Sequence, residues 1–308
     1  LLLLNAGLAV ATVPFYGTFG MTIDWSTFVI PMLAVGFAAA GWVGHMLAPG
    51  RPGEWPIAES LVVFILIALC CMVVTPAQYL AVALDRPLSD PWLARADAFL
   101  GVSVPDAVAW TRDRPWLTWV LGASYGSLQA QFAAPILILG MYWRDRQALW
   151  EYAFHFHLCL ALTLLGLALF PAMCAFSYYG FESLIDQTVF IRDFHALRSG
   201  TFTVLRLTEL EGLITFPSFH VAGGLFVTWV FRRYPVMFGC LVVLNMLMVA
   251  STVLLGPHYA VDILASLLMV AASIVVYDRW GRALINPEPA GPSAAGDPGR
   301  SPRTCPPG

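Results

Sequence analysis

Eight long apolar stretches constrain what this chain can fold into. A helix that crosses the hydrocarbon core of a membrane needs roughly 20 apolar residues. Eight segments approach or exceed that length: residues 1–20, 28–48, 59–84, 116–142, 150–174, 218–232, 236–255 and 259–277. Of the 308 residues, 59% are hydrophobic and 11% are charged, which is far more apolar than a soluble domain. The sequence therefore predicts an all-α, polytopic transmembrane helical bundle of about eight spans.

The two ends of the chain depart from this pattern of long apolar segments. Asn5 and Pro14 interrupt the first apolar segment, so a cleaved signal peptide is the alternative to a first span. From Asn286 onward the chain is rich in proline, glycine and serine, a composition typical of disorder. We expect residues 281–308 to form a disordered cytoplasmic tail.

The basic residues predict how the bundle is oriented. All 16 of them are arginines, and cytoplasmic loops carry an excess of basic residues. Under the eight-span interpretation, seven fall on one side: Arg51, Arg144, Arg146, Arg232, Arg233, Arg279 and Arg282. That side is predicted to be cytoplasmic, so the segments 85–115 and 175–217 face outside or into a lumen. We expect a multi-pass protein of the plasma membrane.

Charge and cysteine spacing argue against several classes of function. A net charge of −3 is too small to indicate a nucleic-acid partner. The six cysteines show no paired spacing typical of zinc or of disulfides. His155 and His157 are two residues apart, which does not align them on a helix. We expect no metal and no cofactor, and the sequence leaves the oligomeric state open.

Two histidine motifs are the candidate chemistry. In Gly256-Pro257-His258-Tyr259-Ala260-Val261-Asp262, a helix that begins at Pro257 would place His258 and Asp262 on one face, one turn apart. The carboxylate would then orient the imidazole of a nucleophile. A buried pair that only tethers two spans is the structural alternative. A second histidine, in Phe216-Pro217-Ser218-Phe219-His220, also lies at the start of an apolar run on the predicted outer side.

The two polar segments on that side differ in character. Residues 85–115 mix charged side chains with Trp92, Phe99 and Trp110, which fits an interfacial amphipathic helix, a pair of short helices, or a solvated connector with aromatic anchors. Residues 175–217 lead directly into the His220 motif, and a segment of that length is more often functional than idle.

Together the two motifs resemble the second and third signatures of the type 2 phosphatidic acid phosphatase superfamily of membrane lipid phosphatases and phosphotransferases. The matching residues are Pro217-Ser218-Phe219-His220, then Ser251-Thr252, His258 and Asp262. Phe219 and the His-Tyr-x-x-Asp form are similar to the inositol phosphorylceramide synthase-like branch. The resemblance covers residues 59–280 as a six-span core and leaves residues 1–58 as two additional N-terminal spans.

The resemblance implies roles for individual residues. His258 would be the nucleophile that becomes a phosphohistidine, and Asp262 would orient it. His220 would protonate the leaving group, and Ser218 would hydrogen-bond a phosphate oxygen. Water would resolve the phosphoenzyme in a phosphatase, and a lipid or sugar alcohol acceptor would resolve it in a transferase. The membrane lipid substrate would be a phospholipid, a lipid phosphate or a sphingolipid.

The cations that bind the phosphate are the open question. The first signature of the superfamily, a lysine followed by an arginine and proline, is not present, and Thr252 replaces the arginine of the third signature. Arg198 is the best substitute, with Arg192 and Arg206 as further candidates, because arginine binds phosphate with two parallel hydrogen bonds. A non-catalytic lipid- or phosphate-binding membrane protein on the same fold is the alternative function.

Overall fold

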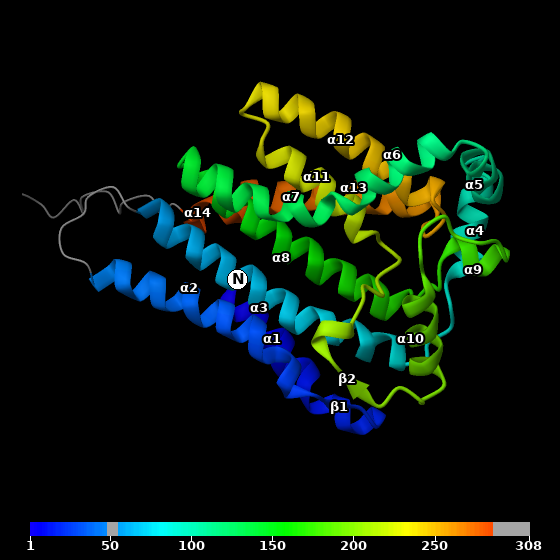
Figure 1. The fold of residues 1–308 in the computed structure, drawn as a ribbon, viewed down its shortest axis with the longest axis horizontal. Helices are drawn as coiled ribbons and strands as arrows, with labels where there is room; N and C mark the ends of the chain where they lie inside the picture. Colours follow the sequence, from blue (N-terminus) through cyan, green and yellow to red (C-terminus); the bar gives the residue numbers. More distant parts are fainter. Residues whose placement is uncertain (48–54, 286–308) are drawn as a thin grey trace, which may run out of the picture.

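The computed structural model describes residues 1–47 and 55–285. Within these residues, six helices are long and apolar enough to cross a membrane: Leu2–Phe19, Trp25–Leu47, Pro56–Ala83, Arg146–Leu169, Pro235–Leu254 and Ala260–Gly281. They run along the long axis of the molecule (Figure 1). The predicted all-α transmembrane bundle is confirmed.

Figure 1 labels these spans by their α-helical parts. They are α1 (Leu2–Thr12) with a 3₁₀ segment at Val13–Phe19, α2 (Val29–Leu47) after a 3₁₀ turn at Trp25–Phe28, α3 (Trp55–Ala83), α8 (Arg146–Leu169), α12 (Pro235–Leu254), and α13 (Ala260–Val276) with a π-helical turn at Tyr277–Gly281.

The other two predicted spans are helical but differ from a simple crossing helix. Residues 116–142 form α6 (Pro115–Gly126), α7 (Leu128–Ala134) and a π-helical segment at Pro135–Tyr142, which begins where proline removes a backbone donor. Residues 218–232 form α11 (Phe219–Val230). Its 12 residues extend only about 18 Å, against a hydrocarbon core of about 30 Å.

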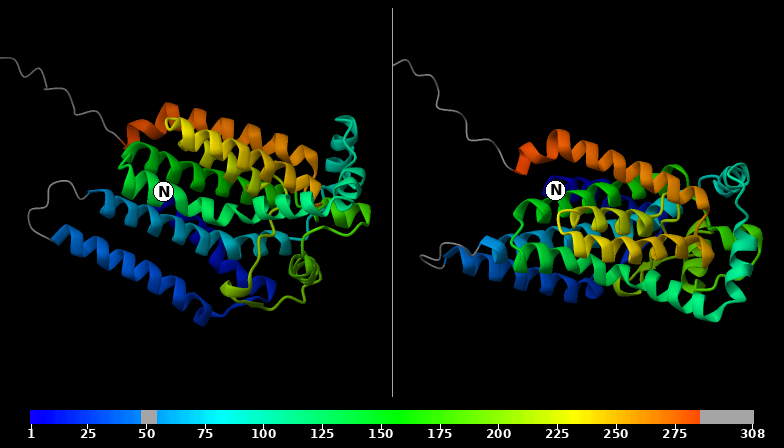
Figure 2. Two further views of the ribbon diagram at one scale, coloured as in Figure 1. Left: turned by 45° about the horizontal axis from the view of Figure 1, so that its top comes forward. Right: turned by 90° about the horizontal axis from the view of Figure 1, so that it is seen from above.

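Short helices gather at one end of the bundle, opposite α14 (Arg282–Ile285) (Figures 1 and 2). They are α4 (Asp90–Phe99), α5 (Val104–Arg112), α9 (Ala175–Tyr179) and α10 (Thr188–Arg198). The prediction of a pair of short helices within residues 85–115 is confirmed by α4 and α5. The polar segments therefore lie where the spans α8 and α12 end and α13 begins.

A two-residue parallel pairing joins the N-terminal region to the segment before α11. Strand β1 (Thr22–Ile23) pairs with β2 (Val204–Leu205), with Thr22 opposite Val204. A 3₁₀ turn at Leu207–Glu209 follows. This pairing fixes residues 204–209 beside the loop between the first two spans.

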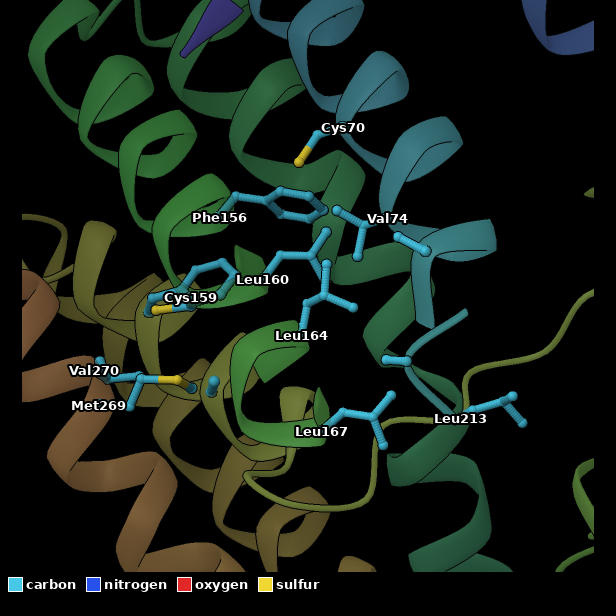
Figure 3. Packing of buried hydrophobic residues seen from close by; sticks show 14 of the residues in the cluster. Cys70, Val74, Phe156, Cys159, Leu160, Leu164, Leu167, Leu213, Met269 and Val270 are labelled. Carbon is cyan, nitrogen blue, oxygen red and sulfur yellow. The ribbon is translucent and has the colours of Figure 1, made fainter. Parts of the chain in front are cut away.

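Helix α8 is the centre of the core. It packs against α3, α11 and α13, and Figure 3 shows Phe156, Cys159 and Leu160 of α8 among buried side chains that include Val74 of α3 and Met269 of α13. Most of the polar side chains of α8 that are buried, such as His155 and His157, have partners inside this core. Helix α8 is thus held on several sides and can serve as a fixed support for the segments that follow it.

The N-terminal spans and the tail lie at the margins of this core. Helices α1 and α2 pack on α3. Residues 281–285 of the predicted tail are helical, and the remainder lies outside the described residues, as does Arg51.

Candidate active site

His258 and Asp262 form a buried pair at the start of α13. The carboxylate Oδ2 of Asp262 lies 3.0 Å from Nδ1 of His258, and the side chains are 5% and 0% exposed. The expected pairing of the two residues is therefore present in the structure.

The helix that carries Asp262 begins later than predicted. Helix α13 begins at Ala260 with Tyr259 as its N-cap, so the expectation that Pro257 starts the helix is wrong. The physical reason is the capping: Oδ2 of Asp262 also accepts the backbone N–H of Tyr259, at 3.1 Å, and an acidic residue in the first turn is favoured by the helix dipole. His258 therefore lies in the turn before the helix, where its own N–H is bonded to the carbonyl of Thr252 at 3.0 Å.

Ser218 contacts the other nitrogen of the same ring. Its Oγ lies 3.2 Å from Nε2 of His258. Ser218 is fully buried and is the N-cap of α11, where its hydroxyl accepts the N–H of Val221. Since a carboxylate only accepts, we assign the ring proton to Nδ1, which leaves the lone pair on Nε2 facing the serine. This is the tautomer that a nucleophilic Nε2 requires.

His220 is the second residue of α11, and its ring packs against an aromatic side chain. Its imidazole stacks on Tyr125 of α6, with ring centroids 4.2 Å apart and an angle of 13° between the planes. Tyr125 had no distinguishing signal in the sequence, because it is one of many aromatic residues in an apolar span.

Both histidines line one cavity of about 420 Å³. The other polar groups in its wall include Gln78, Gln187 and Glu211, and its apolar part is formed by side chains of α3, α7 and α8: Cys71, Val74, Leu128, Phe132, Phe156 and Leu160. Desolvation, together with Asp186 and Asp193, raises the pKa of the Glu211 carboxyl. The cavity thus offers polar groups around the histidines and an apolar surface between spans.

A close approach of α8 fixes the turn before Ser218. Gly166 of α8 lies against Phe216-Pro217, and a Cβ at this glycine would lie 2.3 Å from Cδ of Pro217. Only glycine permits the two backbones to be this near. The core helix α8 therefore sets the position of the chain that carries Ser218 and His220.

The three predicted phosphate-binding arginines do not line the cavity that holds the histidines. Arg192 and Arg206 line a neighbouring cavity of about 440 Å³, and Arg198 lines a third, of about 260 Å³. Each is paired with a nearby carboxylate: Arg192 with Asp193 at 2.8 Å, Arg198 with Asp85 at 2.8 Å, and Arg206 with Asp24 at 3.5 Å. The structure brings Ser218 to His258 but leaves the arginines apart from it.

Ser251 and Thr252, the remaining residues of the signatures, form hydrogen bonds with backbone groups. The hydroxyls of Ser251 and Thr252 donate to carbonyls of their own helix, at 2.6 and 2.7 Å. Thr252, at the position of the missing arginine, contributes its carbonyl to the N–H of His258. No cluster of three or more potential metal ligands occurs in residues 1–47 and 55–285.

Two buried carboxylates that the sequence did not single out lie directly behind the motif. Asp97 of α4 accepts the backbone N–H groups of Ala260 and Val261, and Asp90 accepts the hydroxyl of Tyr259. Their only sequence signal is a spacing of seven residues, which places both on one face of a helix.

Comparison with known proteins gives one family. Residues 91–276, from α4 to the end of α13, match the family model of the PAP2 superfamily, the type 2 phosphatidic acid phosphatases. No curated protein gives a significant match. No solved structure gives one either.

Proposed function

Because the chain belongs to the PAP2 superfamily, we propose that it is an integral membrane enzyme that cleaves or transfers a phosphate group on a lipid through a phosphohistidine at His258. Members of this superfamily are phosphoric ester hydrolases or phosphotransferases. The observation that supports the proposal best is the chain of contacts from Asp262 to His258 to Ser218 at the wall of a cavity that also contains His220.

The first step forms the phosphoenzyme. The lone pair of Nε2 of His258 attacks phosphorus, a P–N bond forms, and the bond to the leaving oxygen breaks. That oxygen takes a proton from His220, whose protonated form the negative charge of the bound phosphate would favour. The carboxylate of Asp262 keeps Nδ1–H in place and stabilises the positive charge that develops on the ring.

The second step releases the phosphate. An oxygen of water or of a lipid alcohol attacks phosphorus, the P–N bond breaks, and His220 takes the proton of the attacking hydroxyl. Hydrolysis and transfer differ only in this acceptor. The phenylalanine before His220 and the His-Tyr-x-x-Asp form support a transferase similar to the inositol phosphorylceramide synthase-like branch.

The negative charge on the phosphoryl group during transfer is stabilised by hydrogen-bond donors that are already held in position. The start of α11 supplies backbone N–H groups that have no partner inside the helix and the positive end of its dipole. The Ser218 hydroxyl, released from Nε2, adds one donor. Arg192 and Arg206 stay candidates for the edge of the site, because Leu210 lines both their cavity and the histidine cavity.

The two-part wall of the cavity supports a lipid substrate. A phosphate at the histidines would leave an acyl chain against the apolar side chains of α3, α7 and α8, and such a molecule would approach from the leaflet. Arginines at the opposite end of the bundle, Arg146 at the start of α8 and Arg233 before α12, support an outward-facing site.

The second candidate is a non-catalytic lipid- or phosphate-binding protein on the same fold. The observation that favours it is the arginine-free wall of the cavity. The two candidates differ in turnover alone, since both would bind a lipid phosphate.

The test follows radiolabelled phosphorus from lipid phosphates and phospholipids in membranes that contain the native chain, His258→Ala or His195→Ala. His195 is the matched control, because it is exposed on α10 and does not line the cavity. We expect the native chain and His195→Ala to release phosphate or to form a new labelled lipid, and His258→Ala to do neither. Equal product in all three membranes would contradict the proposal, and no product in any would favour the binding protein.

A further inference from the structure

Helix α4 presents two buried carboxylates to the segment that carries His258. Asp90 and Asp97 are 2% and 0% exposed, although α4 lies at the end of the bundle and exposes Trp92 and Phe99 elsewhere on its surface. A buried carboxylate is costly unless its oxygens are hydrogen-bonded, so the partners of these two residues indicate what they do.

Asp97 holds the first turn of α13. One carboxylate oxygen accepts the N–H of Ala260 at 2.9 Å and the other accepts the N–H of Val261 at 2.8 Å. These are the first two amides of the helix, which have no partner within it. Both oxygens are needed, because each takes a different amide.

Asp90 connects Tyr259, the residue after His258, to the segment of Met173 and Cys174. It accepts the hydroxyl of Tyr259 at 2.9 Å and the N–H groups of Met173 and Cys174, at 2.9 and 3.2 Å. Cys174 has φ +113°, a conformation that neighbouring contacts must maintain in a residue other than glycine. Burial and the nearby Asp90 raise the pKa of the Tyr259 phenol, so the hydroxyl stays a donor.

The three residues after His258 are thus tied to one helix. Neither aspartate lines the cavity, so neither is placed to touch a substrate. We propose that Asp90 and Asp97 are positioning residues: they clamp residues 259–261 so that the ring of His258 stays aligned between Asp262 and Ser218. The proposal rests on the proposed role of His258 as the nucleophile.

The kinetic prediction separates positioning from binding. In Asp97→Asn one of the two acceptors becomes a donor that faces a backbone N–H. We expect kcat to fall roughly 10- to 100-fold, the scale of a misplacement of about 1 Å, while KM stays within about twofold. Asp97→Glu, which keeps the charge but displaces the carboxylate, should not restore the rate. Asp106→Asn on α5, where the side chain is exposed, is the matched control and should retain native kinetics.

A structural measurement needs no substrate. Hydrogen–deuterium exchange should rise in residues 258–264 of Asp97→Asn and stay native in the rest of the described spans. Tyr259→Phe removes only the hydroxyl that donates a hydrogen bond to Asp90. This variant should lower kcat several-fold at unchanged KM. If Asp97→Asn does not fold, Tyr259→Phe tests the clamp in its place.

Native kcat and native exchange in Asp97→Asn and Tyr259→Phe would overturn the clamp, and so would a raised KM at native kcat. If the native chain turns over no faster than His258→Ala, the proposed function fails, while exchange at residues 258–264 still tests the clamp.

Discussion

At the scale of single residues, one imidazole ring carries most of the proposed chemistry. Asp262 and Ser218 lie at its two nitrogens, and the carbonyl of Thr252 holds its backbone. Because both side chains are buried, these contacts are protected from water and act at short range. The ring is therefore fixed before a substrate arrives.

Two substitutions of Ser218 separate its contact with His258 from its role as a helix cap. Its hydroxyl contacts His258 and also caps α11. Replacement of an N-cap serine by alanine costs about 1 kcal/mol of stability, whereas replacement by glycine costs only a few tenths. Ser218→Ala and Ser218→Gly should both lose roughly 100-fold in turnover, as when one donor to a developing oxyanion is removed, but only Ser218→Ala should unfold at lower denaturant concentration.

Assays of turnover and of unfolding in detergent check this prediction. Native turnover in Ser218→Gly would show that the serine acts through the helix cap alone.

The residue spacing predicted part of this site. Asp262 follows His258 by four residues, and that local spacing was enough to predict the pair. Ser218 lies 40 positions away, so its role was indicated by the family resemblance. The start of α13 differs from the prediction because Asp262 caps the helix at Tyr259, a local contact that the prediction from Pro257 leaves out. Asp97 also holds this start, but it is 163 positions from Ala260, and no local pattern reports such a contact.

At the scale of elements, the site depends on how closely α8 approaches α11. Gly166 of α8 touches the Phe216-Pro217 turn that precedes Ser218 and His220. A displaced turn would move both side chains relative to His258 on α13. Helix packing and catalysis are therefore linked at this glycine.

Gly166→Ala should both destabilise the protein and lower its activity. The new Cβ would lie 2.3 Å from Pro217 and 3.0 Å from the carbonyl oxygen of Phe216, and overpacking of this kind costs about 1–3 kcal/mol. Gly122→Ala on α6 is the control, because nothing lies within 4 Å of its Cβ position. Melting in detergent should show a lower transition for Gly166→Ala only; equal transitions would mean that the turn can move aside.

At the scale of the whole molecule, the long apolar segments predicted the helical bundle well. In the described residues, each of the eight apolar segments is helical over most of its length, since a segment in lipid must satisfy its backbone internally. The lengths of α11 and of the broken helix from Pro115 to Tyr142 could not be predicted, because turns and π-helical segments depend on the neighbouring helices. The surroundings of the arginines could not be predicted either, because the fold of the loops places each of the three beside a different carboxylate.

The orientation of the bundle is testable with a membrane-impermeant thiol reagent. Ser103 between α4 and α5 and Arg144 before α8 are both exposed and lie at opposite ends. In a chain with Cys305→Ser, we expect Ser103→Cys to react in intact cells and Arg144→Cys to react only after permeabilisation. The reverse pattern would place the histidine cavity on the cytoplasmic side.

The most direct test of the central claim is to locate the phosphoryl group on the protein. The native chain is mixed briefly with a radiolabelled lipid phosphate, quenched in base, and digested, beside His258→Ala and the control His195→Ala. We predict an acid-labile, base-stable label on the peptide that contains His258, present in the native chain and in His195→Ala and lost in His258→Ala. A label that persists in His258→Ala, or turnover in that variant at the native rate, would contradict the account.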